Sequence, residues 1–384
     1  MVKKGRRGHG EGTVTQRKDG RWHGAFYSED GKRHFVYGST QQEALAKLRK
    51  AQREDEQGML VTGPNLKLGA YLEQWLEEVQ KPTLRVSSYV KYRKLINSYI
   101  VPALGGFQLQ KLMPQHVQAL YTKMGKKGLS PKTIQNVHGL LHNALDNAMR
   151  WNLVARNVTS MVKPPRIRKK EKQSVNLEQA RALMLAARGD RLEMFIALAL
   201  TTGMRRGELL ALRWSDVDLD KHVLHVRRTV DFIARYGYVE NEPKTERSRR
   251  DILLPLFVVT MLKAHRVSQL EQRLKVGSDW VDLDLVICGL EGNYLNPRYI
   301  LKMFAKLLQS AGLPHMRIHD LRHSVLSLLV GMQIDPLSVQ ELAGHEDITT
   351  TLGVYGHVNY SMLQFIADKF DEVFKQDWMS DDVN

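Results

Sequence analysis

Residues 317–358 constrain the fold of this chain more than any other stretch, because they set reactive polar side chains into an apolar helical pattern. Leu321, Val325, Leu328 and Leu329 recur at three- and four-residue spacing, which predicts a helix with one buried side. His319 and Arg322 stand three residues apart and would share the opposite face. The stretch therefore predicts an amphipathic helix that packs on a domain core and presents a His–Arg pair.

The same stretch collects groups that suit a phosphodiester. The Arg322 guanidinium can bind two non-bridging phosphate oxygens, and a neutral His319 can donate and transfer a proton. Gly344 and His345 follow, and Tyr355 comes ten residues after that histidine. A tyrosine, with a pKa of about 10, needs a base and cationic neighbours to attack at neutral pH. Each piece alone is more often a surface pair or a core aromatic, so the prediction rests on their order.

The charge of the chain favours a nucleic-acid partner. The net charge is +16 and the isoelectric point is about 9.7, and DNA affinity is built largely from contacts between cations and phosphates. A basic surface that only faces solvent is the alternative. The length of 384 residues allows two or three domains.

Other features concern the compartment. No run approaches 18 apolar residues, so no transmembrane helix is expected, and MVKKGRRGHGEG lacks the apolar core of a signal peptide. Cys288 is the single cysteine, so we expect it in a core, in a reducing compartment such as the cytoplasm or the nucleoid. The histidines show no CxxC or HExxH spacing, which gives no support for zinc.

The first 62 residues predict a small domain that binds DNA. Three β-prone runs, Gly12–Gln16, Trp22–Ser28 and Lys32–Gly38, are separated by Asp-Gly turn signals. A capping box at Thr40 opens a helix of about 18 residues. A stabilising β-appendage is the alternative. The cations expected to meet DNA are Lys3, Lys4, Arg6, Arg7, Arg17, Lys18 and Arg21.

Residues 63–162 predict a helical domain. Apolar spacing indicates a helix from Leu68 to Pro82 and a second from about Ser87 to Tyr99. Pro114 opens a third helix, and a fourth runs from Ser130 to Met149. A plain helical bundle would show the same pattern. Residues 163–173 read as a basic linker along phosphates, with Arg166, Arg168, Lys169 and Lys170.

A last domain, residues 174–384, carries two more polar clusters. In TTGMRRGELL, Glu208 stands three residues after Arg205 and can orient its guanidinium on one helical face. An ordinary salt-bridged helix would give the same RRGE. Strands are predicted at His222–Val230 and Asp251–Pro255, on either side of PKTERSRR, which contains Lys244.

Five clusters in this order, TGMRRGEL, PKTERSRRDILLP, HDLRH, AGH and TTTLGVYGH, resemble the boxes of the tyrosine recombinases, in particular the lambda-type integrases of phages and conjugative transposons. The resemblance covers nearly the whole chain. It implies a multidomain α+β fold: an arm-type DNA-binding domain with a three-stranded sheet and a helix, a helical core-binding domain, and a mainly helical catalytic domain with a small antiparallel sheet. Ala343 and Met204 depart from the usual residues without touching a catalytic atom.

The resemblance also implies roles. Arg205 and Arg322 would clamp the scissile phosphate, with Arg206 a bystander. Lys244, as an ammonium on a short hairpin, would protonate the leaving 5′ oxygen. Arg247, Arg249 and Arg250 would touch backbone or solvent. The remaining implied roles are His319 as proton acceptor, His345 as hydrogen-bond donor, Tyr355 as nucleophile forming a 3′-phosphotyrosine, and Glu208 and His323 as supporting residues.

Because one ester replaces another, the resemblance implies no ATP and no obligatory metal. The implied partners are double-stranded DNA at core and arm attachment sites, a homotetramer on that DNA, and accessory DNA-bending and directionality proteins, with no membrane. The amphipathic tail after Tyr355 packs at home or on a neighbouring protomer. A regulator that binds without cutting, or a type IB topoisomerase, are the alternative functions. The intact catalytic set argues against the first, and the integrase-like domain order argues against the second.

Overall fold

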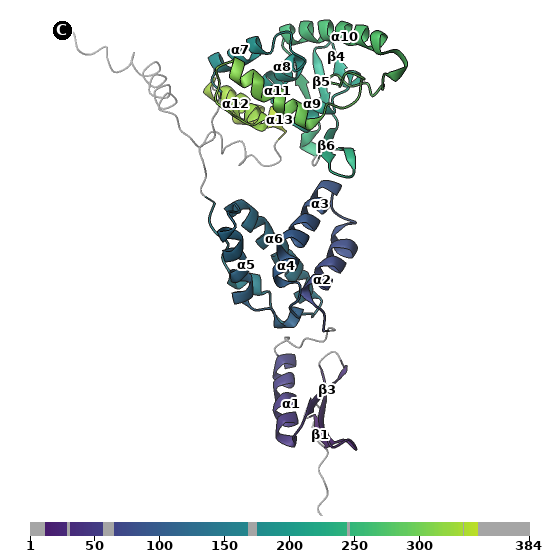
Figure 1. The fold of residues 1–384 in the computed structure, drawn as a ribbon, viewed down its shortest axis with the longest axis vertical. Coiled ribbons are helices and arrows are strands. Elements are labelled where there is room, and N and C mark those ends of the chain that lie inside the picture. The colour runs from purple at the N-terminus through teal and green to yellow at the C-terminus, as the bar shows by residue number, and fades with distance from the viewer. Residues whose placement is uncertain are drawn as a thin grey trace, which may run out of the picture. The chain divides into compact units, whose positions relative to one another are not determined.

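The computed structural model describes residues 12–28, 31–56, 65–167, 175–243, 246–332 and 334–344. The chain divides into two compact units, residues 1–169 and 170–384, which are treated separately below (Figure 1). Within the described residues, every helix is too short or too polar to cross a bilayer.

The first unit begins with the expected three-stranded antiparallel sheet. Its strands are β1 (Thr13–Gln16), β2 (Trp22–Tyr27) and β3 (Arg33–Gly38), in the order β1-β2-β3. Helix α1 (Gln41–Glu56) packs against the sheet and buries Ala44 and Leu48. The predicted cap is present in part, because Glu43 N–H donates to Thr40 Oγ1 at 3.2 Å. The Glu43 carboxylate accepts from Ser39 N at 2.8 Å instead of from Thr40.

The rest of the first unit is helical, as the apolar spacing predicts. Tyr71, Leu72, Trp75 and Leu141 lie at the centre of its core. The helix predicted to end at Tyr99 continues in π-helical and α-helical turns to residue 104. Its helices are α2 (Leu68–Gln74), η1 (Trp75–Gln80), α3 (Val86–Leu95), η2 (Ile96–Ile100), α4 (Val101–Leu104), η3 (Leu109–Lys111), α5 (Pro114–Lys126), α6 (Pro131–Arg150) and η4 (Val158–Met161).

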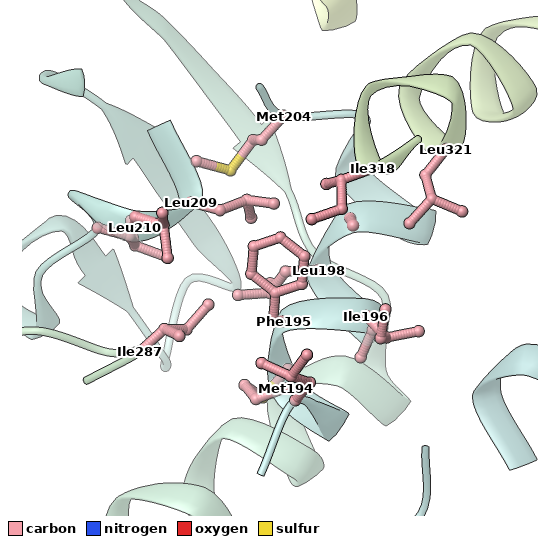
Figure 2. Close-up of a cluster of buried hydrophobic side chains, with 14 of the residues drawn as sticks. Met194, Phe195, Ile196, Leu198, Met204, Leu209, Leu210, Ile287, Ile318 and Leu321 are labelled. Carbon is pink, nitrogen blue, oxygen red and sulfur yellow. The ribbon is translucent and has the colours of Figure 1, made fainter. Parts of the chain in front are cut away.

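The second unit is built around α8 (Glu193–Thr202), whose sequence EMFIALALTT is apolar on every side and is therefore buried. Helix α8 contacts α7, α9, α10 and α12. Figure 2 shows Phe195 and Leu198 of α8 among the side chains of this core. The other helices are α7 (Leu177–Ala186), α9 (Arg206–Leu210), η5 (Trp214–Asp216), η6 (Glu246–Ser248), α10 (Leu256–Val276), η7 (Gly277–Asp279), α11 (Pro297–Ser310), α12 (Ile318–Gly331) and α13 (Pro336–Ala343).

Two small antiparallel sheets complete this unit, and here the strand predictions were partly wrong. The run expected as one strand, His222–Val230, forms β5 (Val223–Val226) and the start of β6 (Thr229–Ile233). One sheet has the order β4-β5-β8, and the other pairs β6 with β7. The remaining strands are β4 (Val217–Asp218), β7 (Gly237–Asn241), which was not predicted, and β8 (Arg250–Leu253).

The cysteine expected in a core is only half-buried. The thiol of Cys288 is free, and its sulfur accepts a hydrogen bond from Gln269 Nε2 at 2.9 Å. Burial raises the pKa of this thiol, which disfavours the reactive thiolate.

Candidate active site

Arg205 stands at the entrance to α9. Helix α8 ends at Gly203, whose φ of +60° suits glycine, and Arg205 is the extended N-cap residue of α9. Its backbone N donates to Glu208 Oε2 at 2.9 Å, and its Nη1 donates to Oε1 at 2.7 Å. Glu208 therefore orients the guanidinium as predicted, but through a cap and not across a shared helical face. The Arg205 side chain is 37% exposed, whereas that of Glu208 is 3% exposed.

Helix α12 confirms the prediction of an amphipathic helix over the HDLRH cluster. Arg322 is buried, and its Nη1 donates to the Gly203 carbonyl at 2.6 Å. Burial, followed by the charge of Arg205, lowers the pKa of Arg322 to about 9, so the guanidinium remains charged at neutral pH. His319 is exposed and His323 is half-buried on the same helix, and their rings meet edge to face with centroids 4.9 Å apart.

The start of α12 is held by a second carboxylate. Arg317 donates to Asp320 from its backbone N at 2.9 Å and from Nη2 at 2.8 Å. The hydrogen bond from the Arg317 side chain is the main reason that the pKa of Asp320 is lowered. Ser324 donates to the Asp320 carbonyl and accepts from Val175 N at 2.8 Å. These contacts fix the helix that carries His319 and Arg322.

Three arginines converge on the last turn of α13. Arg250 Nε donates to the Leu342 carbonyl at 2.7 Å, and Arg322 Nη2 donates to the Ala343 carbonyl. Arg205 Nη2 donates to the Gly344 carbonyl at 3.1 Å. The final carbonyls of a helix lack intrahelical partners and carry partial negative charge, so they attract cations. The arrangement thus brings the Arg205 and Arg322 guanidiniums to one place, directly before His345 in the chain.

Arg250 corrects the expectation that it touches backbone or solvent. It is 8% exposed, and besides its carbonyl contacts its Nη2 donates to Glu208 Oε2 at 3.0 Å. Burial alone would raise the pKa of Glu208, but the charges and hydrogen bonds of Arg250 and Arg205 outweigh burial and lower it. The period-two pattern of β8 could have revealed this residue, since Arg250 alternates inward together with Ile252.

A cleft of about 1120 Å³ lies beside this network. It is lined from β5, β8, the segment before β8, and α13, by residues that include His225, Arg227, Arg247, Arg249 and Leu337. Neither Arg205 nor Arg322 lines it. The cleft is therefore a basic neighbour of the arginine pair and not the place where the two guanidiniums meet.

Several predicted site residues lie outside the described residues: Lys244, His345 and Tyr355, and the cations Lys3, Lys4, Arg6, Arg7, Arg168, Lys169 and Lys170. Of the other predicted DNA-contacting cations, Arg17, Lys18 and Arg21 are exposed around the turn between β1 and β2, and Arg166 is exposed after η4. Within the described ranges, no group of three or more His, Cys, Asp or Glu side chains is placed to hold a metal ion.

Comparison with known proteins places these features in a family. Residues 173–362 match the phage integrase family, and residues 67–125 match the phage integrase N-terminal SAM-like domain. The tyrosine recombinase XerC-like protein of Caldanaerobacter subterraneus subsp. tengcongensis is 31% identical, over 86% of this chain and 90% of the relative. The ICEBs1 integrase of Bacillus subtilis is 26% identical, over 87% of this chain and 91% of the relative.

Solved structures agree on the fold. The Tn1549 transposon integrase in complex with transposon right end DNA superposes with a TM-score of 0.69 at 20% identity, covering 79% of this chain and 99% of that one. A lambda integrase tetramer bound to a Holliday junction gives a TM-score of 0.55 at 16% identity, covering 91% and 96%. Sequence motifs, family matches and a relative of nearly the same extent all agree, and the chain belongs to the phage integrase family of tyrosine recombinases.

Proposed function

We propose that this tyrosine recombinase is the integrase and excisionase of a mobile element, with Tyr355 as its nucleophile. The observation that supports the proposal most is the convergence of Arg205 and Arg322 on the neighbouring carbonyls of Gly344 and Ala343. Two guanidiniums at one place can bind the non-bridging oxygens of a single phosphate. The integrases among its relatives favour this function over a regulator that does not cut and over a topoisomerase.

In the proposed reaction, the Tyr355 oxygen attacks the scissile phosphorus and the bond to the 5′ oxygen breaks. His319 accepts the phenol proton, and Lys244 gives a proton to the departing 5′ oxygen. Arg205 and Arg322, with a hydrogen bond from His345, neutralise the pentacoordinate transition state. Glu208 and His323 support these groups. Attack by the 5′ hydroxyl of a second strand reverses the steps and releases the tyrosine, so the number of ester bonds is conserved.

We assign arm-site binding to the domain of residues 1–62. On one face of its sheet, Phe35 and Tyr37 are about half exposed, at 48% and 49%. The Arg33 guanidinium lies 5.2 Å from the Phe35 ring centroid, and that of Arg17 lies 5.9 Å from the Tyr37 centroid. Exposed aromatic rings beside cations suit a sheet that contacts bases and phosphates together.

The proposed partners follow from this division of work. Residues 63–162 and the catalytic domain 174–384 would hold core-site DNA, with the basic linker 163–173 along its phosphates. The enzyme would act as a homotetramer, as the structure of a lambda integrase tetramer on a Holliday junction suggests, assisted by DNA-bending and directionality proteins. Its place would be the cytoplasm, on the nucleoid.

The test uses a nicked suicide duplex built from the attachment junction in the DNA that flanks the gene. Wild-type protein should form a complex stable to SDS, and Tyr355→Phe should bind the duplex with similar affinity but form none. An SDS-stable complex of the phenylalanine variant would remove Tyr355 from the proposal and turn attention to Tyr360, five residues further along the chain.

A further inference from the structure

The Arg250 side chain joins three segments that carry or adjoin candidate catalytic residues. Its Nε donates to the Leu342 carbonyl at 2.7 Å, and its Nη2 donates to Glu208 Oε2 at 3.0 Å. Its Nη1 donates to the Ser248 carbonyl at 3.2 Å, in the segment that follows Lys244. The side chain is 3% exposed, so Arg250 is shielded from a DNA phosphate and acts only through these partners.

We propose that Arg250 is a positioning residue for strand cleavage. By binding Glu208 and the last turn of α13 at once, it fixes the Arg205 guanidinium and the point from which the chain continues to His345. This inference rests on the proposed function, because it assigns Arg250 a part in the same cleavage reaction.

The link from Arg250 to Arg205 runs through one carboxylate. Glu208 Oε2 accepts from Arg250 Nη2 and from Arg205 N, while Oε1 accepts from Arg205 Nη1 at 2.7 Å. Without Arg250, one side of this buried carboxylate would lose its partner, and Glu208 would be free to follow Arg205 outward. The Arg205 guanidinium is 37% exposed, so a shift of its support would move the group that faces DNA.

The link from Arg250 to α13 depends on close approach. A Cβ placed on Gly344 would lie 3.0 Å from Arg250 Nη1 and 3.1 Å from the Arg247 carbonyl. Glycine at this position therefore lets the guanidinium lie against the end of the helix. Leu342 and Gly344 accept from Arg250 and Arg205 respectively, so both arginines bind the same short turn.

The test compares Arg250→Met with Arg249→Met in the full-length protein on the suicide duplex described above. Arg249 is the matched control, because it is the adjacent arginine and its exposed side chain pairs with Glu242 at 2.8 Å. Single-turnover cleavage is measured against DNA concentration. A displacement of about 1 Å in a catalytic group costs roughly 10²-fold in rate, so R250M should lower the rate at saturating DNA by about 10–100-fold. The DNA concentration for half-saturation should stay within about twofold, and R249M should cleave at the wild-type rate.

Two further variants separate positioning from loss of fold. Arg250→Lys keeps the charge but replaces a planar fork by one ammonium, so it should fold, bind DNA normally and cleave about tenfold more slowly. Adding Glu208→Gln to R250M should cost much less than the product of the two single losses, because both changes break one connection.

The outcomes are distinct. Wild-type cleavage by R250K or by R250M would overturn the positioning role, as would rate losses in R250M and E208Q that simply multiply. Weaker DNA binding by folded R250K, with an unchanged rate at saturation, would also overturn it. Failure of the wild-type protein to form any covalent complex would count against the proposed function, whereas an active wild type with an indifferent Arg250 would count against this inference alone.

Discussion

At the scale of single residues, the charge balance of the site depends on Glu208. Its buried carboxylate binds two arginines, Arg205 and Arg250, and Arg322 lies close enough for the charge of Glu208 to act on its pKa. A buried charge is stable only when it is paired and hydrogen-bonded. The three guanidiniums would repel one another, and the single carboxylate together with the carbonyls at the end of α13 offsets that repulsion.

We predict that Glu208→Gln destabilises the fold by about 3–5 kcal/mol at neutral pH, because it leaves buried arginine charge unpaired. The pKa of Glu208 is lowered in the folded protein. Its contribution is therefore complete above the unfolded pKa of about 4.3 and is lost as the pH falls through the folded value. In denaturant unfolding, the gap between wild type and variant should be widest near pH 7 and should close in acid. A gap that is constant from pH 7 to pH 3 would contradict this.

A second prediction at this scale concerns Lys244. If its ammonium protonates the 5′ oxygen, Lys244→Ala should slow cleavage by roughly 10²–10⁴-fold with little change in DNA binding. Replacement of the bridging 5′ oxygen by sulfur should restore cleavage, because a thiolate, whose conjugate acid has a pKa of about 8.5, leaves without a proton. Arg205→Ala and Arg322→Ala should not be restored. Equal rescue of all three variants, or no rescue of K244A, would move the general acid to Arg247 or His345.

At the scale of elements, the end of α13 is where α9, α12 and β8 meet through their arginines. Helix α13 ends because Gly344 adopts a φ of +60°, a conformation that costs other residues about 1–2 kcal/mol. The turn therefore depends on glycine both for its backbone angle and for the space beside Arg250.

Gly344→Ala should accordingly lower stability by about 1–2 kcal/mol and slow cleavage more than it weakens DNA binding. Gly331→Ala is the matched control, since a Cβ there meets nothing within 4 Å and alanine favours a helix. Thermal unfolding and single-turnover cleavage measure the two effects. If G344A and G331A behave alike in both assays, the special role of this turn is excluded.

The elements also show how far local pattern can be trusted. The spacing around HDLRH predicted α12 and its buried side, because one periodic face must meet a core. The strand predicted at His222–Val230 was wrong as one element. Its middle residues Arg227 and Arg228 reach the buried Asp216, with Arg228 Nη1 2.6 Å from Oδ2, and no local window contains that distant partner.

The same limit applies to the site. The proximity of Arg205 and Glu208 followed from their spacing, but the cap geometry depends on Gly203 ending α8 just before. Arg250 was assigned to backbone or solvent because its partners, Glu208 and Leu342, are far away in sequence. Roles for Lys244, His345 and Tyr355 came from motif order alone and stay predictions.

At the scale of the whole molecule, the account divides labour between separate parts of the chain. The basic residues before α1 and the exposed aromatics of the sheet belong to one end, while Arg205 and Arg322 belong to the unit of residues 170–384. Binding to outlying DNA and cleavage at the core should therefore be separable.

Removal of residues 1–62 should abolish binding to arm-site DNA and leave cleavage of core-site suicide DNA measurable. Phe35→Ala is a milder form of the same test, since its ring is half exposed and its loss should weaken arm binding without unfolding the domain. Full-length binding should fall steeply with salt. Equal loss of both activities in a folded truncation would reject this division.

The most direct measurement of the central claim is the chemical identity of the covalent link. Wild-type protein trapped on the suicide duplex is digested with nuclease and trypsin, and the nucleotide-bearing peptide is sequenced by mass spectrometry. The tryptic peptide of residues 323–369 contains both Tyr355 and Tyr360, so fragmentation decides between them. The account predicts a nucleotide joined through its 3′ phosphate to the Tyr355 oxygen. A nucleotide on Tyr360 or another residue, or a link through a 5′ phosphate, would contradict it.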